Sequence, residues 1–527
     1  MTARTTLLTA SALLACQRAP APGDAASEAT TEAATTAAAS STDAPDDPTT
    51  GGEASPETAR LVHSFGTFSL SPLQETQPCV QWTLGNEQAV YVNAVTLVND
   101  GGYHHSNWFV VPEDVFAGDD GYWDCWDRDF TEIEAAVEGT VLFAQSTQSR
   151  NEVMALPQGV VVKVPPRHKV IAQTHLLNLG STALDTELRL ALDIIHPRDV
   201  DVVVAPMHLD YRDLEILADS RTRFTGHCSF AETYEKSIGH PLDLKLYYVL
   251  PHYHGFGESF RLEVIGGPRD GEVLFNLDGF NGDANGRAFD PPIDLTGAQG
   301  LRFSCGYNNW LPTTLGYGNG DGEMCMMLGL ADARVMIESR VVEGSKPVGV
   351  DGDVILYEAE CANYGVFKNP AQGPPTQAEK DGPLYVPPRE PGDVDLEPTK
   401  PCVDSDPAAA PSEPPTLTTL RGAVFTPSCT FSSCHDASAP AAGLDLQTAA
   451  GLRDRLLAHT VVADTARPLV APGDPDSSWL YTLVSTCDPT DSKGQVVKHM
   501  PYNAPTLMPD PLVAQVRAWI AAGALDD

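Results

Sequence analysis

Short apolar runs separated by turn residues dominate the middle of the chain, from about residue 60 to 365. Residues 160–164, 244–249 and 333–337 are rich in aliphatic or tyrosine side chains, and each run has the length of a strand. Clusters of glycine, asparagine and aspartate, such as the one at 316–320, punctuate these runs. The pattern predicts antiparallel β-sandwiches or jelly rolls, and about 300 residues are enough for two of them in tandem.

Two low-complexity segments border this β-rich region. Residues 17–58 are almost entirely alanine, threonine, serine, proline, aspartate and glutamate, which offer too little apolar surface to offset the entropy of ordering. Residues 366–415 are rich in proline, glycine and acidic residues and mark a second boundary. Beyond them, the run 512–521 has helical character. We expect a mainly β protein with a disordered tether, two jelly-roll domains, an acidic linker and a small all-α domain, at 17–58, 59–210, 211–365, 366–415 and 416–527.

Residues 1–16 resemble a bacterial lipoprotein signal peptide. Arg4 precedes an apolar stretch, residues 7–15, which is too short to span a membrane. The Leu-Leu-Ala-Cys run that ends at Cys16 resembles a lipobox, in which the cysteine is lipidated and becomes the new N-terminus. Gln17, in place of an aspartate, favours the outer membrane. We expect a lipid-anchored protein of the bacterial cell envelope, periplasmic or at the outer membrane surface; the alternative is an ordinary secretory signal.

Charge and composition exclude several classes of function. The chain has 33 lysine and arginine residues against 71 aspartate and glutamate residues, a formal net charge of −38. This balance repels phosphate backbones, so nucleic acid is not an expected partner. No apolar run approaches the roughly 20 residues of a membrane-spanning helix. The 11 cysteines fit an oxidising compartment in which thiols pair.

Five histidines in the β-rich region form an ordered set of candidate metal ligands. His104 and His105 are adjacent, His175 follows in Gln-Thr-His, and His252 and His254 form a His-x-His motif. Residues two apart on a strand share a face, so His252 and His254 can bind one ion without backbone distortion. Adjacent histidines diverge, so ligation by both members of the first pair requires a bend or bulge, which two preceding glycines permit.

Met324, in a Gly-Glu-Met-Cys run, completes the set. Imidazole suits copper, zinc, iron or nickel, and a thioether ligand shifts the preference towards Cu(I). Met326 shares a strand face with Met324 and is the alternative ligand. The remaining histidines of interest, His208, His227 and His240, are expected to be structural or surface residues.

The order His-His, Gln-x-His, His-x-His and Glu-Met-Cys resembles the copper type II ascorbate-dependent monooxygenases, the family of peptidylglycine α-hydroxylating and dopamine β-monooxygenases. The resemblance covers about residues 60 to 365. It implies two jelly-roll domains that face a solvent-filled cleft, each with one copper ion. The electron-transfer copper would bind His104, His105 and His175, and the copper at which oxygen and substrate react would bind His252, His254 and Met324.

The family resemblance also implies disulfides and reactants. A C–H bond is hydroxylated with O2 and two electrons from a reductant such as ascorbate, and the second copper stores one of those electrons. The disulfide next to Met324 would brace that ligand. The implied pairs are Cys79 with Cys125, Cys228 with Cys361, and Cys305 with Cys325.

The neighbourhood of the second ligand set departs from the peptide-amidating members. Those enzymes hold a peptide carboxylate with an arginine just before the His-x-His and with an asparagine and a tyrosine after the methionine. Here Leu250 and Pro251 precede His252, and apolar residues follow Met324. We therefore expect a small neutral or apolar substrate.

The C-terminal domain contains a candidate haem site. Cys429, Cys434 and His435 form Cys-x4-Cys-His, a longer version of the Cys-x-x-Cys-His attachment motif. The thiols would add to the haem vinyl groups, and His435 would bind the iron. Downstream residues resemble small bacterial c-type cytochromes, in which the methionine of a Met-Pro turn is the second axial ligand; this is Met500 here. The alternatives are ligation by His499, and a disulfide between the two cysteines in a domain without haem.

The combined interpretation is an exported lipoprotein that joins a copper-dependent monooxygenase module to a haem c domain. Electrons would come from ascorbate, an electron-transfer protein or the fused haem. One alternative is a non-catalytic copper-binding or electron-transfer envelope lipoprotein, and another is a structural β-sandwich protein with incidental histidines. The two cysteines left over, Cys402 and Cys487, would join the linker to the C-terminal domain.

Overall fold

The computed structural model describes residues 57–527, apart from 146–149, 179–181, 255, 279–285, 319–321, 333–334, 368–369, 389–395, 397–401, 431–433, 438–439, 462–463, 495, 503 and 505. The predicted signal peptide and nearly all of the predicted tether lie outside the described residues. The same holds for Cys16, so lipidation stays a prediction.

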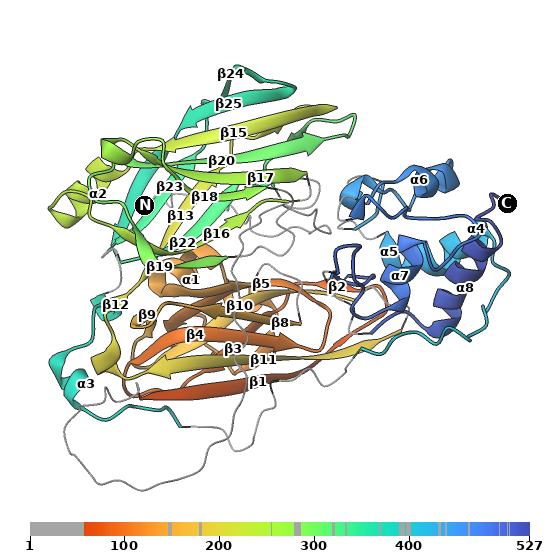
Figure 1. The fold of residues 1–527 in the computed structure, drawn as a ribbon. Coiled ribbons are helices and arrows are strands. Elements are labelled where there is room, and N and C mark those ends of the chain that lie inside the picture. The colour runs from red at the N-terminus through yellow and green to blue at the C-terminus, as the bar shows by residue number, and fades with distance from the viewer. Residues whose placement is uncertain are drawn as a thin grey trace, which may run out of the picture.

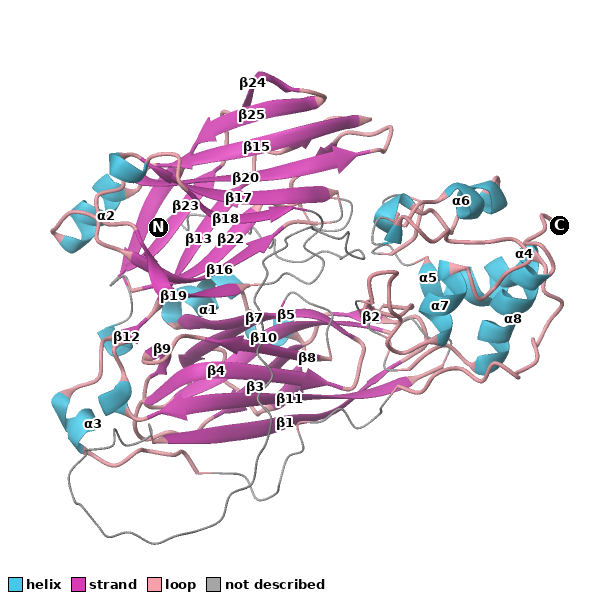
Figure 2. Cartoon of the chain, in the orientation of Figure 1, coloured by secondary structure: helices cyan, strands magenta, loops and turns pink. Residues whose placement is uncertain are grey.

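The first β-rich region forms two six-stranded sheets (Figures 1 and 2). Short helices η1 (Cys125–Arg128), α1 (Glu132–Glu138) and η2 (Pro197–Asp199) connect some of the strands. The strands are β1 (Thr58–Leu70), β2 (Glu75–Thr76), β3 (Cys79–Thr83), β4 (Val90–Asn99), β5 (Tyr103–Pro112), β6 (Gly121–Trp123), β7 (Thr140–Gln145), β8 (Asn151–Ala155), β9 (Val160–Val164), β10 (His168–Leu177), β11 (Leu184–Ile195) and β12 (Val202–Val203).

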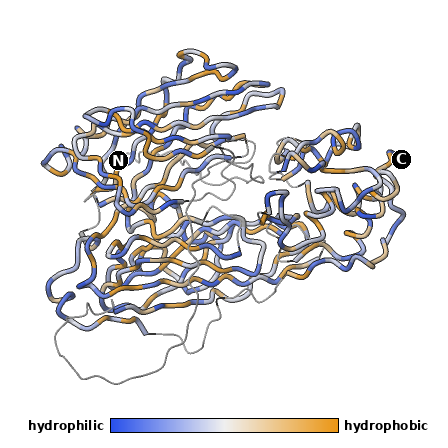
Figure 3. Tube along the Cα trace, viewed as in Figure 1, coloured by the Kyte–Doolittle hydropathy of each residue, from blue (hydrophilic) through white to orange (hydrophobic). Residues whose placement is uncertain are grey.

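These two sheets enclose one apolar cluster. One sheet has the order β1-β11-β4-β9-β12 with β8 beside β4, and the other has the order β6-β3-β10-β5-β7 with β2 beside β10. Val95 and Leu190 from the first sheet and Val110 and Val170 from the second are all buried in the cluster. Hydrophobic and hydrophilic residues alternate along many strands in Figure 3, as burial of one face of each sheet requires. The run predicted at 160–164 is β9.

The second β-rich region repeats this arrangement. Helix α2 (Ala231–Ile238) and the turn η3 (Gly267–Arg269) lie in its connections. Its strands are β13 (Ala205–Tyr211), β14 (Glu215–Ile216), β15 (Ser220–Cys228), β16 (Lys245–His252), β17 (Gly257–Ile265), β18 (Val273–Asp278), β19 (Arg287–Asp294), β20 (Gly300–Asn309), β21 (Leu315–Gly316), β22 (Met326–Ala331), β23 (Val335–Val341), β24 (Lys346–Asp351), β25 (Val354–Glu360) and β26 (Ala362–Phe367).

The second region has two six-stranded sheets, with the orders β19-β16-β22-β13-β23-β26 and β18-β17-β20-β15-β25-β24, and a small pair of β14 and β21. Leu209 and Met327 from the first of these sheets and Phe224 and Phe303 from the second share a buried cluster. The mainly β prediction is therefore confirmed. The change between sheet pairs falls before β13, a few residues ahead of the boundary predicted at 210/211, because β13 pairs with β22 and β23.

One face of the β16-β22 sheet joins the two β-rich regions. Tyr248 and Leu250 on β16 and Leu330 on β22 are buried in the same apolar cluster as the core of the first region. Their neighbours Val249 and Met327 belong instead to the core of the second region. Side chains of this sheet that do not face the inner core of the second region therefore lie on the opposite face, which contacts the first region.

The C-terminal residues form a small helical unit. Trp479 and Trp519 are almost completely buried in its apolar core. The helix predicted around 512–521 is α8 (Asp510–Ala521). The helices are α4 (Leu417–Leu420), η5 (Arg421–Phe425), α5 (Thr426–Cys429), η6 (Ala441–Gly443), α6 (Leu452–Ala458), α7 (Trp479–Ser485) and α8 (Asp510–Ala521), and the linker contains η4 (Pro370–Gln372) and α3 (Gln377–Asp381).

Four disulfides crosslink the chain, and all four expected pairs are present. They are compatible with an extracytoplasmic protein because such bonds persist in oxidising compartments. None of the helices in the described part of the chain has the length and apolar character needed to cross a membrane. The pairs are Cys79–Cys125, Cys228–Cys361, Cys305–Cys325 and Cys402–Cys487.

Candidate metal centre

The second predicted ligand set gathers on one face of the β16-β22 sheet. His252 ends β16 and lies opposite Met326 on β22 in the strand register. Tyr253 and Cys325 are buried in the inner core of the second β-rich region. Because side chains alternate along extended chain, the residues on either side of them, including His254 and Met324, face away from that core.

The Nε2 atoms of His252 and His254 are the ring atoms available to bind a cation. Their ring centroids are 5.2 Å apart. The Nε2 atoms of His252 and His254 are buried and have no hydrogen-bond partner among the described residues. His254 Nδ1 lies 2.8 Å from the carbonyl oxygen of Gly322, and because a carbonyl only accepts, Nδ1 carries the proton and Nε2 carries the lone pair.

Burial keeps both imidazoles neutral. Burial, with the neighbouring His254 as a smaller cause, lowers the pKa of His252 to about 3. Burial also lowers the pKa of His254 to about 4, against a weaker opposing effect of the Gly322 carbonyl. Neutral imidazole is the form that binds metals. Two buried, unpartnered ring nitrogens therefore fit the predicted metal ion.

A buried carboxylate fixes the backbone around His254. Glu323 is fully buried, and its two carboxylate oxygens accept the backbone N–H groups of His254 at 2.7 Å and Phe256 at 2.6 Å. At the next residue of the chain, the carbonyl oxygen of Met324 accepts a hydrogen bond from the Tyr307 hydroxyl at 2.6 Å. Glu323 is thus a positioning residue that the sequence pattern did not reveal.

Glu323→Gln is expected to weaken metal binding by about 10–100-fold, the usual cost of losing a residue that orients ligands. Glutamine offers one acceptor, so one of the two backbone N–H groups loses its partner, which costs about 1–3 kcal/mol of stability. Metal titration and thermal unfolding measure the two effects. Glu258→Gln on β17 is the control; equal metal affinity in both variants would contradict the positioning role.

Both candidate methionines are buried on the outward face. Met324 is 0% and Met326 is 3% exposed. The sulfur of Met326 already lies 3.8 Å from the Tyr317 hydroxyl, a weak hydrogen bond. Among the described residues, no hydrogen bond reaches the sulfur of Met324. The arrangement favours Met324 over Met326 as the thioether ligand.

The first predicted ligand set lies on β5 and β10 of the first β-rich region. His105 on β5 lies opposite His175 on β10, and the next pair in the register is Leu176 with Tyr103. The pairing skips His104, so the backbone has the irregularity that ligation by both adjacent histidines would require. The side chain of His104 lies outside the described residues.

A carboxylate orients His175. Glu75 Oε1 lies 2.7 Å from His175 Nε2, and His175 Nδ1 lies 2.9 Å from His105 Nε2. The hydrogen bond with His175 lowers the pKa of Glu75, so its carboxylate is ionised and accepts the Nε2 proton. The lone pair of His175 is then on Nδ1, towards His105. Imidazole oriented by a carboxylate is a common feature of metal sites, and Glu75 was missed because it lies far from both histidines in the sequence.

The structure thus brings together His105 with His175, and His252 with His254 and Met324. Considering only histidine, cysteine, aspartate and glutamate in the described residues, no group of three or more is arranged to hold a metal ion. The proposed sets also use the thioether of Met324 and the imidazole of His104, which lie outside that group of side chains or outside the described residues.

The three histidines expected to be structural or surface residues each lie near a carboxylate. His227 Nε2 lies 3.3 Å from Glu358, and His240, near Asp243, is exposed. His208 Nδ1 lies 2.9 Å from Glu338. These contacts agree with the expected structural or surface role.

The His208–Glu338 pair is expected to make stability depend on pH. Burial lowers the pKa of His208, but Glu338 more than offsets this effect, so the net pKa is raised. Such a pair stabilises fully below the unfolded pKa of histidine, about 6.5, and its effect is lost as pH rises through the raised value. His208→Gln should lower the unfolding free energy by about 1–3 kcal/mol at pH 6. The difference in melting temperature should shrink towards pH 9; a constant difference would contradict the assignment.

The candidate haem residues adjoin the C-terminal core. Cys429 ends α5, and neither Cys429 nor Cys434 is in a disulfide. Burial raises the pKa of the Cys429 thiol to about 12, so it is protonated at neutral pH. His435 Nδ1 lies 3.0 Å from the Leu444 carbonyl oxygen, which only accepts. Nδ1 therefore carries the proton and Nε2 the lone pair that an iron ion would need.

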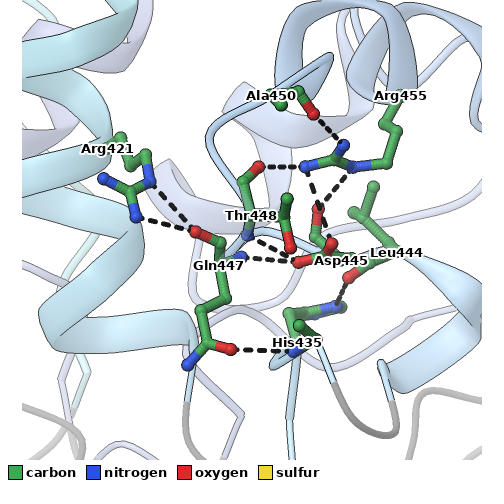
Figure 4. Close-up of polar contacts among 9 residues, drawn as sticks. Arg421, His435, Leu444, Asp445, Gln447, Thr448, Ala450 and Arg455 are labelled. Carbon is green, nitrogen blue, oxygen red and sulfur yellow. Dashed lines mark hydrogen bonds and ion pairs between the residues drawn. The ribbon is translucent and has the colours of Figure 1, made fainter.

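Two arginines fix the loop that orients His435 (Figure 4). Arg421 donates to the carbonyl oxygen of Gln447 at 2.8 and 3.0 Å. Arg455 donates to the carbonyl oxygens of Asp445 at 3.0 Å and Ala450 at 2.6 Å. These contacts hold the chain that begins at Leu444 and so set the position of the His435 ring.

The contacts of His499 favour Met500 as the second axial ligand. Met500 packs against the apolar core of the helical unit. Both ring nitrogens of His499 already lie near carbonyl oxygens, Nδ1 at 3.1 Å from Cys487 and Nε2 at 3.3 Å from Ala504. Ligation by His499 would break one of these contacts.

Comparison with known proteins adds little. No family model matches the chain. No curated protein matches it either. Among the solved structures that match is the major capsid protein P2 from bacteriophage PM2, at 8% identity and a TM-score of 0.26, with 50% of this chain and 97% of that chain covered. A likeness this weak carries no argument about fold or function.

Proposed function

We propose that this chain is a copper-dependent monooxygenase that hydroxylates a C–H bond of a small substrate with O2. One observation carries the proposal: His252, His254 and Met324 lie on one buried sheet face, and both histidine Nε2 atoms lack partners among the described residues. Two imidazoles and one thioether form a ligand set that favours Cu(I), the copper state that binds oxygen.

The residues around this set hold the ligands rather than react. The Gly322 carbonyl fixes the tautomer of His254, and Glu323 fixes the backbone that carries it. Apolar packing around Tyr248, Leu250 and Leu330 excludes water from the adjoining part of the sheet face. A bound copper would supply the one-electron chemistry and the site of oxygen activation.

We propose that the first set, His104, His105 and His175, binds a second copper ion that stores an electron. Hydroxylation consumes O2, two electrons and two protons, and it releases one water molecule. Glu75 supports this role because it presents His175 Nδ1 towards His105. Ascorbate or an electron-transfer protein would supply the electrons.

We also propose that the C-terminal unit is a cytochrome c-like domain with one haem c. Cys429 and Cys434 would attach the haem, and His435 and Met500 would bind the iron. The orientation of the His435 ring supports this assignment. With Cys16 lipidated, the protein would be anchored in the bacterial cell envelope.

Oxygen consumption with copper-loaded protein and ascorbate, measured against a panel of small substrates, tests the monooxygenase. The expected result is substrate-dependent O2 uptake, with one labelled oxygen atom from ¹⁸O2 in the product. Copper that cycles between oxidation states without labelled product would favour the alternative, a non-catalytic copper-binding or electron-transfer lipoprotein.

Stopped-flow spectroscopy tests whether the haem supplies electrons. The linker keeps the haem at high effective concentration near the coppers, so pre-reduced haem should oxidise when O2 and substrate are added. A haem that stays reduced while ascorbate supports turnover would show that the domain serves another acceptor.

A further inference from the structure

An arginine from a distant part of the sequence adjoins the second ligand set. Asp210 on β13 lies opposite Met326 on β22. The Tyr211 N–H donates to the Cys325 carbonyl oxygen at 2.9 Å, so the pairing continues past the end of β13. One residue further, Arg212 stands opposite Met324. It points to the same face as Met324, because Tyr211 and Cys325 both face the inner core.

The guanidinium group of Arg212 is held in place at one side only. Arg212 Nε donates to Oδ2 of Asp210, which is fully buried. The guanidinium carbon lies 5.5 Å from the centre of the Tyr317 ring, whose hydroxyl contacts the sulfur of Met326. The guanidinium therefore adjoins the candidate ligands rather than extending freely into solvent.

The other end of the Arg212 guanidinium remains available. Its two terminal amino groups make no hydrogen bond with any residue in the described part of the chain, and 21% of the side chain is exposed. Arg340, by contrast, uses a terminal amino group to bind Glu338 at 2.6 Å. A planar fork of N–H donors matches the two oxygens of a carboxylate.

Two arginines and two carboxylates meet at this point. Arg212 and Arg340 both contact Oδ2 of Asp210, and Arg340 also pairs with Glu338. Asp210 is fully buried, whereas part of the Arg212 side chain is exposed, so a ligand that arrives from solvent meets the guanidinium rather than the Asp210 carboxylate. The chain as a whole has a net charge of −38 and repels anions. A small anion could be held only where a local cation offsets that repulsion.

We propose that Arg212 binds a carboxylate group of the substrate and so positions the substrate beside His252, His254 and Met324. The role in hydroxylation rests on the proposed function, whereas the binding of a carboxylate does not. It replaces the expectation of a neutral or apolar substrate. That expectation was based on the residues next to His252 and Met324 in the sequence. Arg212 is distant in the sequence and is brought to this face by the pairing of β13 with β22.

Binding of benzoate and its neutral counterpart benzamide to the full, copper-free chain tests the proposal by calorimetry. The wild-type protein should bind benzoate at least tenfold more tightly than benzamide. Arg212→Gln should lose at least tenfold in benzoate affinity, and Arg212→Lys should retain part of it through its charge. The control Arg221→Gln, which removes a positive charge from β15 on the opposite sheet, should change benzoate affinity little.

Equal binding of the two compounds by the wild-type protein would overturn the proposal, as would unchanged benzoate affinity in Arg212→Gln. If Arg212→Gln does not fold, a crystal of the wild-type protein soaked with 4-bromobenzoate gives a second test. Anomalous bromine signal with the carboxylate bound to Arg212 would support the site. Absence of the compound from Arg212 would overturn the proposal. Because copper is absent, failure here is distinct from failure of the monooxygenase proposal, which the O2 measurements test.

Discussion

Met324→Ile is expected to abolish hydroxylation while the protein stays folded. The two side chains have similar volume, and such buried exchanges usually cost less than about 1.5 kcal/mol. The thioether, however, is the only soft ligand of the proposed set, and isoleucine has no donor atom. Turnover should fall below detection, while the melting temperature changes by only a few degrees.

X-ray absorption of the reduced, copper-loaded protein gives the direct signature. The wild-type spectrum should contain a sulfur neighbour of copper, and the Met324→Ile spectrum should lack it. Met326→Ile is the matched control, since Met326 is equally buried on the same face. Normal turnover in Met324→Ile together with lost turnover in Met326→Ile would assign the ligand role to Met326.

Replacing both Cys429 and Cys434 by serine is expected to remove all covalently bound haem. Serine cannot form the thioether bonds, so haem should be extracted from the denatured variant but not from the wild-type protein. The measurement is the haem absorbance that stays with the chain after expression in a host that matures c-type cytochromes. Copper content should be unchanged, because these residues lie outside both copper ligand sets.

The double variant of Cys402 and Cys487 is the control for this experiment. It removes a cysteine pair from the same part of the chain, but that pair forms a disulfide. Haem should remain covalently attached in this control. A wild-type chain that carries no haem under these conditions would contradict the haem assignment.

Short apolar runs separated by turn residues were sufficient to predict the class of fold. Runs such as 160–164 became strands with the expected bounds because burial of one or both faces sets the pattern directly. The irregularity at His104 was predicted only as a requirement for ligation by both adjacent histidines. Three of the disulfide pairs followed from the family resemblance, and the fourth, Cys402–Cys487, joined the two cysteines left over.

The residues that support the candidate sites were not predictable in the same way. Glu75 reaches His175 across 100 residues of sequence, and Arg212 reaches the face of Met324 through the pairing of β13 with β22. Such contacts depend on strand order and register, which the hydrophobic pattern does not specify. Glu323 stood within the quoted motif, but its bonds to the backbone of His254 and Phe256 depend on how the loops meet.

Metal analysis of the purified protein after copper loading tests the central proposal most directly. The account predicts close to two copper ions per chain, and close to one in His252→Ala, which should retain the set on β5 and β10. Zinc retained in place of copper after loading, or the same copper content in His252→Ala as in the wild-type protein, would contradict it.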